Sequence, residues 1–157
     1  PHCIGTILTY NEKVSFGADG LTFDPKGNLY IGNFADGTLH KIEFNEKGEP
    51  TTPRPAPIWA KAPFMKSCDG ILYDQATDKI YVADSQAIAI QMVGLDGSVQ
   101  CYAQEPTDDG RDGKLDQPCE VVIRNGQMII SNFDMPVVGG VNKKFEVPNS
   151  LSVIKME

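Results

Sequence analysis

The sequence lacks a long hydrophobic run and carries little positive charge. No stretch approaches the ~20 apolar residues that a membrane-spanning helix needs, so we expect no membrane partner. Lysine and arginine number 14 against 21 aspartate and glutamate residues, which gives a formal net charge of −7. Proteins that bind nucleic acid concentrate Lys and Arg on one surface, so the composition argues against a nucleic-acid partner. The acidic balance is compatible with cation binding and equally with plain solubility.

Cysteine is sparse, and no C-x-x-C pair is present, so zinc-site spacing is absent. The cysteines are Cys3, Cys68, Cys101 and Cys119. Because the chain is not as rich in cysteine as small secreted disulfide domains are, we expect free thiols. A Cys68–Cys119 pair is the alternative, since both residues stand at the start of a repeated unit. Nothing in the sequence separates a soluble cytoplasmic protein from a periplasmic or secreted one.

One pattern occurs three times at an interval of 50 residues. In each copy, a segment with alternating apolar residues is followed, after a short turn, by a second strand-like segment. The paired segments are 19–24 with 27–34, 69–74 with 78–85, and 119–124 with 126–133. A fixed period of this size is typical of repeat proteins, in which each unit buries its apolar face against its neighbours. Because each unit is a run of short strands, the sequence predicts an all-β fold of the β-propeller type.

The repeats predict three blades of about four strands each, at residues 17–66, 67–117 and 118–157. Residues 4–10 are expected to form one more strand ahead of them. Propellers typically have about 4–8 blades, so three blades do not close a ring. We therefore expect half of a six-bladed ring. The other half is either the rest of a longer chain, the favoured interpretation for a chain that begins at Pro1 rather than Met, or a second copy in a homodimer.

An incomplete ring predicts two open flanks. Each flank is expected to show alternating apolar residues to water, such as Leu21, Phe23, Val121 and Ile123. Exposed apolar patches beyond a few hundred Å² usually mark an interface or an aggregation hazard. We therefore expect that the isolated chain is not a stable closed monomer.

The starts of the innermost strands are the candidate site, because they lie at one mouth of a propeller's central channel. The repeat places Asp19, Asp69 and Cys119 at these starts, with Glu120 immediately beside. Carboxylates that converge on one point repel one another unless a cation neutralises them, and carboxylate oxygens suit calcium or magnesium. The alternative is turn chemistry, in which Asp caps the backbone and Gly supplies a positive φ.

Several segments resemble motifs of the gluconolactonase/regucalcin-like superfamily, which includes lactonases and diisopropyl-fluorophosphatase. Residues 17–24 with 27–30 are similar to one of its blades. Residues 112–122 resemble a loop with Gly-Lys that leads into Pro-Asn-Asp and an apolar strand, and residues 134–151 are similar to the insertion that follows. The resemblance implies a six-bladed propeller that holds calcium in its channel and hydrolyses small-molecule lactones or phosphoric esters there.

Carried over by position, the resemblance implies metal ligands at Asp19, Asp69, Glu120 and Cys119, with Asp69 and Glu120 as catalytic residues. Asp19 stands where the family's first blade has Glu, Cys119 replaces the Asn of Pro-Asn-Asp, and Glu120 replaces its Asp. A thiol is a poor ligand for a hard cation, so Glu120 would supply the oxygen if the register shifts by one residue. The segment around Asp19 also resembles the later blade that supplies the family's Asp ligand, and that register stays open.

We therefore expect a calcium-dependent hydrolase of lactones or related esters. The alternative is a non-enzymatic propeller scaffold that has lost the metal site, because Cys119 stands in the usual place of Asn. Three further polar residues, Asn33, Asp84 and Asn132, end the second strands of their units, and we expect them to be turn caps and not ligands.

Overall fold

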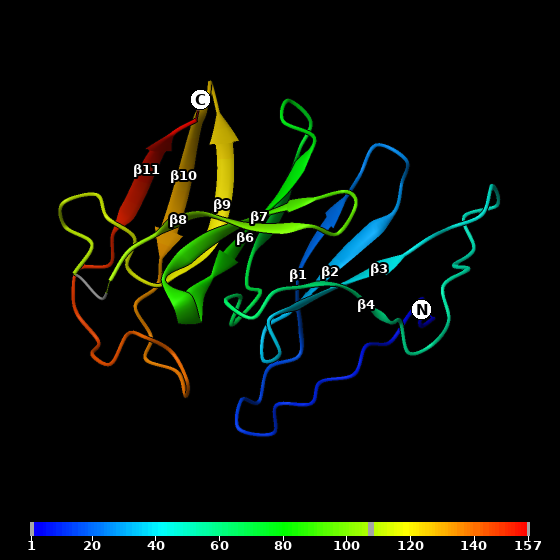
Figure 1. Cartoon of the computed structure of the whole chain (residues 1–157), viewed down its shortest axis with the longest axis horizontal. Coiled ribbons are helices and arrows are strands. Elements are labelled where there is room, and N and C mark those ends of the chain that lie inside the picture. Colours follow the sequence, from blue (N-terminus) through cyan, green and yellow to red (C-terminus); the bar gives the residue numbers. More distant parts are fainter. Residues whose placement is uncertain (1, 107–108, 157) are drawn as a thin grey trace.

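The computed structural model describes residues 2–106 and 109–156, which form eleven strands in three antiparallel sheets (Figure 1). The helical content of these residues is a single 3₁₀ turn, η1 (Ser85–Ala87). The three sheets stand next to one another, each packed on the one before it, as the blades of a propeller do. The predicted all-β propeller fold is confirmed.

Each strand pairs with the next one along the chain, so every sheet is an up-and-down meander. The first sheet contains β1 (Ala18–Phe23), β2 (Leu29–Asn33), β3 (Thr38–Ile42) and β4 (Ile58–Lys61). The second contains β5 (Ile71–Asp74), β6 (Lys79–Asp84), β7 (Ala89–Gly94) and β8 (Val99–Gln104). The third contains, within the described part of the chain, β9 (Pro118–Arg124), β10 (Gln127–Asn132) and β11 (Leu151–Lys155).

Turn residues set the hairpins that the sequence pattern indicates. Between β9 and β10, Asn125 and Gly126 have φ values of 52° and 71°. Two successive positive φ values match the twist of a tight hairpin, which is why Asn-Gly is favoured there. The pairing of Ile123 with Met128 directly beyond this turn fixes which residues of the third sheet share a face.

Two apolar cores hold the sheets together. The buried residues of the first core, between the first and second sheets, include Tyr30, Leu39, Ile71, Ile80 and Val82. Those of the second core, between the second and third sheets, include Tyr81, Ile90, Val121, Met128 and Ile130. Burying one large apolar side chain stabilises a fold by roughly 1.5–3 kcal/mol, so the contacts between faces hold the three sheets as one unit.

The first strand of each sheet uses equivalent positions to contact the preceding sheet. Ile71 is buried in the first core and Val121 in the second. Leu21 occupies the same position in β1, where the described residues provide no preceding sheet, and it is 59% exposed. Phe23, two residues further on, is 58% exposed. The expected exposure of Leu21 and Phe23 is therefore confirmed.

The expected exposure of Val121 and Ile123 is wrong. Val121 is 1% exposed, and Ile123 packs against the second core, because both side chains face the second sheet. Strand side chains alternate between faces, so the open face of the third sheet instead shows Val122, Leu151 and Val153, all of which are exposed.

Residues 4–10 do not form the expected strand. Figure 1 shows this segment, in dark blue, running beneath the first sheet. It crosses the face of that sheet: Ile7 packs against the apolar cluster of Leu29, Ile31 and Ile42, and the Ala56 amide donates to the Thr6 carbonyl at 2.7 Å. A segment that crosses a face, and does not follow an edge, has no continuous partner for a ladder of hydrogen bonds.

All four cysteines lie within the described residues and are free thiols, as expected. Among the same residues, no helix has the length and apolar character needed to cross a membrane.

Candidate functional site

The inner strands approach one another most closely at the repeated Asp-Gly positions. A Cβ atom on Gly20 would collide with the Asp69 carbonyl oxygen, and one on Gly70 would lie 2.6 Å from the Cys119 carbonyl oxygen. The Gly70 amide donates to that same Cys119 oxygen at 2.8 Å. Neither glycine has a positive φ, so close contact between strands, not turn geometry, accounts for the repeated glycine.

These contacts also fix the register of the repeat. Gly20 meets Asp69 in the way that Gly70 meets Cys119, so Asp69 and Cys119 are equivalent positions. The one-residue shift that would put Glu120 at the Asp69 position does not occur. Glu120 instead occupies the Gly70 position, and its carboxylate lies against Gly70.

Asp69 lies close enough to two other carboxylates, those of Asp19 and Glu120, for their charges to affect it. The pKa of Asp69 is raised to about 6: burial is the largest cause, hydrogen bonds from Ser85 and Gly70 oppose the shift, and the negative charges of Asp19 and Glu120 add to it. Burial also raises the pKa of Asp19 above its ordinary value. Asp19 and Glu120 are therefore each near enough to Asp69 for their charges to act on it.

Ser85 orients Asp69 and was not identified from the sequence. Its hydroxyl oxygen lies 2.7 Å from Asp69 Oδ2 and 2.6 Å from the Pro118 carbonyl oxygen. Ser85 is buried at the start of η1, directly after β6. The contact joins residues 16 positions apart, so no local pattern indicates it.

Cys119 has the chemistry of a neutral thiol. Burial is the largest cause that raises its pKa, the charges of Asp69 and Glu120 add to the shift, and a hydrogen bond with Ser131 opposes it. The Sγ atom lies 3.2 Å from the Ser131 hydroxyl oxygen. A protonated, soft donor is poorly suited to a hard cation.

The residues that end the second strands act as caps, as expected. Asp84 is fully buried and accepts hydrogen bonds from the Lys66 amide, the Ser67 amide and hydroxyl, the Ala87 amide and the Gln91 side chain. Asn132 accepts from the Asp116 amide at 3.1 Å, and Asn33 donates to the Leu8 carbonyl at 3.0 Å. All three side chains tie neighbouring loops to strand ends.

The three carboxylates suit calcium in the type of donor atom but do not form a complete site in this chain. Calcium takes about 6–8 oxygen ligands. Within residues 2–106 and 109–156, no group of three or more His, Cys, Asp or Glu side chains is arranged to hold a metal ion. Three carboxylates supply fewer oxygen atoms than calcium takes, so further oxygen ligands would have to come from elsewhere.

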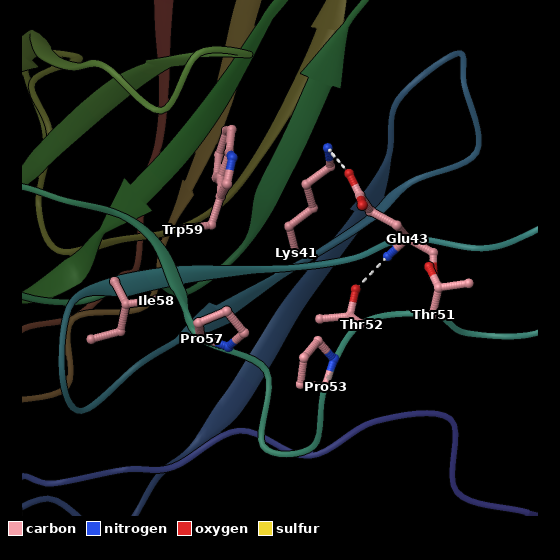
Figure 2. A pocket seen from close by; sticks show the side chains of 8 residues that line it. All are labelled: Lys41, Glu43, Thr51, Thr52, Pro53, Pro57, Ile58 and Trp59. Atoms are coloured by element: carbon pink, nitrogen blue, oxygen red, sulfur yellow. Dashed lines mark hydrogen bonds and ion pairs between the residues drawn. The ribbon is translucent and has the colours of Figure 1, made fainter.

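A pocket of about 480 Å³ lies at the outer strands β3 and β4 of the first sheet (Figure 2). It is lined by Trp59 and Ile58 of β4, by Lys41 of β3, and by the segment that follows β3. Lys41 Nζ pairs with Glu43 at 2.7 Å, and the Glu43 amide donates to the Thr52 hydroxyl at 2.8 Å. None of the predicted site residues lines this pocket, and its lining belongs to a single sheet and the segment that follows β3.

Comparison with known proteins supports the fold. No family model matches the chain, and no curated protein matches it. Among solved structures, a luciferin-regenerating enzyme is similar with a TM-score of 0.64 and 11% identity, over 87% of this chain and 43% of that one. The regucalcin of Agrobacterium tumefaciens strain C58, described as a calcium-binding protein, has a TM-score of 0.56 and 17% identity, over 73% of this chain and 37% of that one.

Virginiamycin B lyase from Staphylococcus aureus is also similar, with a TM-score of 0.51 and 18% identity, over 76% of this chain and 36% of that one. The chain thus spans less than half the length of each of these three proteins. At such identities the likeness defines a class of fold, the β-propeller, and leaves the activity open.

Proposed function

We propose that this chain forms half of a propeller hydrolase that acts on lactones or related esters at a calcium ion held in the channel. The observation that carries the proposal is the position of Asp69, a half-buried carboxylate between two other acids at the channel mouth. Perturbed pKa values in a concave, partly desolvated place are typical of catalytic groups. The remaining ring, from the same chain or from a second copy, would complete the site.

Asp69, Ser85 and Glu120 would have different roles in hydrolysis. Asp69, half-buried beside Ser85, would orient the attacking water next to the metal. Ser85 would hold Asp69 in position through the 2.7 Å hydrogen bond. Glu120 is exposed and would accept a proton from water or orient it.

Asp19, Asp69 and Glu120 are the residues that would hold calcium, together with oxygen atoms from the other half of the ring. When bound, calcium polarises the carbonyl or phosphoryl oxygen of the substrate. The proposal includes no role for the Cys119 thiol as a ligand, because the thiol is protonated and forms a hydrogen bond with the Ser131 hydroxyl.

Calcium titration of the chain, followed by thermal unfolding and by turnover of a panel of lactones, tests the proposal. We expect calcium to raise the melting temperature and to be required for turnover. Asp69→Asn should remove both effects, whereas Glu46→Gln, which removes the same charge from an exposed turn, should leave both in place. The proposal is overturned if calcium does not stabilise the unaltered protein with its ring complete and this protein hydrolyses no lactone.

The second candidate is a binding scaffold without a metal, favoured by the neutral Cys119 at the position equivalent to Asp69. Cys119→Asn separates the two candidates, because it replaces the thiol with an amide oxygen that suits calcium. A hydrolase with a weakened site should gain calcium affinity in this variant. A scaffold should bind calcium in neither form.

A further inference from the structure

Two apolar segments meet at the channel mouth, at the end of the sheets where the inner strands begin. The first, residues 13–16, directly precedes β1 and Asp19. The second belongs to the loop of residues 134–148, which follows Asn132, and Asn132 pairs with Pro118 at the start of β9. Figure 1 shows both segments at the lower end of the sheets.

The loop of residues 134–148 is anchored to Gln86, the residue that follows the Ser85 partner of Asp69. The Val141 amide donates to the Gln86 carbonyl at 2.8 Å, and the Gln86 side chain donates to the Val138 carbonyl at 3.3 Å. Gln86 follows Ser85, whose hydroxyl holds Asp69. One short turn, η1, therefore connects the loop to the acidic cluster.

The base of this loop is fixed by buried polar groups. Asp134 is buried and accepts a hydrogen bond from the side chain of Asn142, which is also buried, at 2.5 Å. Asn142 also donates to the side chain of Gln117 at 3.2 Å, just ahead of β9. These buried hydrogen bonds fix the position of the loop relative to β9.

The two segments enclose a pocket of about 300 Å³, which we call the mouth pocket. Its apolar lining consists of Val14, Phe16, Met135, Pro136, Val137 and Val138. Phe16 is 49% exposed and Val138 is 61% exposed. Phe16 is held in place by an edge-on contact with Phe34, with ring centres 5.5 Å apart.

We infer that the mouth pocket binds an alkyl or aryl substituent of the substrate, so that the substrate class is an apolar lactone or ester and not a sugar lactone. The inference rests on the proposed function and deepens it. Small-molecule sites combine an apolar lining with a few polar groups that fix orientation, and pockets of about 300 Å³ are large enough for a drug-like group. Here the pocket supplies the apolar lining, and the acids, which do not line it, would meet the ester group of the same substrate at the strand starts beyond Phe16 and Gln86.

The composition of the lining decides between the two substrate classes. A sugar ring presents hydroxyl groups that need hydrogen-bond partners, and burying them against apolar side chains is costly. The mouth pocket offers mainly hydrocarbon, with Lys13 and Ser15 as its polar lining residues. An alkyl chain or an aromatic ring gains from the same lining, because binding removes its apolar surface from water.

Val138→Asp tests the inference, with Val147→Asp as its matched control. Val147 lies in the same loop and is equally exposed, but it does not line the mouth pocket. We expect the unaltered chain to prefer δ-decanolactone over glucono-δ-lactone. Val138→Asp should raise KM for δ-decanolactone about tenfold, with kcat and the KM for glucono-δ-lactone little changed, whereas Val147→Asp should change neither KM.

Calorimetric binding of δ-decanolactam, which the protein cannot hydrolyse as a lactone, separates this inference from the proposed activity. Suppose that the lactam binds, that Val138→Asp weakens lactam binding about tenfold, and that no lactone is hydrolysed. The inference about the mouth pocket is then supported, and the hydrolase proposal fails. If lactones are hydrolysed but Val138→Asp leaves the preference and lactam binding unchanged, the hydrolase stands and the inference is overturned. Absence of both lactam binding and turnover overturns both.

Discussion

Asp69 is a carboxylate whose surroundings oppose its charge. Its pKa is raised from 3.8 to about 6, so the folded chain favours the protonated form. The stabilisation from this protonation is complete below pH 3.8 and is lost as the pH rises through 6. A shift of this size corresponds to about 3 kcal/mol, and partial solvent access reduces it to an effect on the order of 1 kcal/mol.

Asp69→Asn should therefore stabilise the chain at pH 8 by about 1 kcal/mol relative to the unaltered protein and should have little effect at pH 3.5. The measurement is urea unfolding across this pH range, compared with Glu46→Gln, which removes an exposed carboxylate. A constant difference between Asp69→Asn and the unaltered chain at every pH would contradict the assigned shift.

Gly70 is needed because two strands touch at its position. A Cβ there would meet the Cys119 carbonyl oxygen at 2.6 Å and would collide with the Glu120 carboxylate. Since backbone atoms cannot move aside cheaply, Gly70→Ala should cost about 1–3 kcal/mol of unfolding free energy. At Gly17 the nearest atom is the movable Thr9 hydroxyl oxygen at 3.1 Å, so Gly17→Ala should cost under about 0.5 kcal/mol. Equal costs in chemical denaturation would show that close packing is not the reason for Gly70.

At the scale of elements, the connection between β6 and β7 depends on Asp84. This buried side chain accepts hydrogen bonds from the Ser67 and Ala87 amides and caps η1. Asp84→Ala leaves several buried donors without an acceptor, and each such group costs about 1–3 kcal/mol, so we expect a loss of about 3 kcal/mol or more. Asp84→Asn keeps one acceptor oxygen and should lose less. Equal losses in the two variants, measured by thermal unfolding, would mean that the hydrogen bonds are not responsible.

The elements that the sequence predicted are those that local patterns determine. Alternating residues in segments such as Ile71–Asp74, and turn residues such as Asn125 and Gly126, follow from the chain's own stereochemistry. The segment 4–10 has the same local character but crosses a sheet face, and only the tertiary structure decides whether an edge is available. The period of 50 residues also predicted which positions are equivalent in space, because Gly20 and Gly70 make the same kind of contact with the following strand.

The candidate site was predictable only in part for the same reason. The repeat placed Asp19, Asp69 and Glu120 at strand starts, and the charges of Asp19 and Glu120 both contribute to the raised pKa of Asp69, while their role as a joint site stays a prediction. Ser85 and the residues of the mouth pocket were missed, because their relation to the acids depends on how separate loops pack. The reason for the repeated Asp-Gly was also missed, since a contact between strands leaves the same sequence pattern as a turn.

At the scale of the whole molecule, the two open flanks are complementary. The open face of the first sheet and that of the third carry the kinds of residues that pack against each other at the two interfaces between sheets. Leu21 occupies the position at which Ile71 and Val121 pack on a preceding sheet. Val122 occupies the position of Leu72, which packs toward the following sheet. The third sheet's open flank can therefore receive the first sheet's open flank of a second copy by repeating an existing interface, although residues 4–10 already cover part of that face.

We expect the chain to self-associate at micromolar concentration through these flanks, as two copies that complete a ring or as larger assemblies. Leu151→Lys combined with Val153→Lys places charge on the open face of the third sheet and should shift sedimentation toward the monomer. Val147→Lys alters an equally exposed residue of the loop of residues 134–148 and should leave the association unchanged. A single monomeric species with a cooperative melt, for the unaltered chain at the same concentration, would show that three packed sheets need no partner and that the flank argument is wrong.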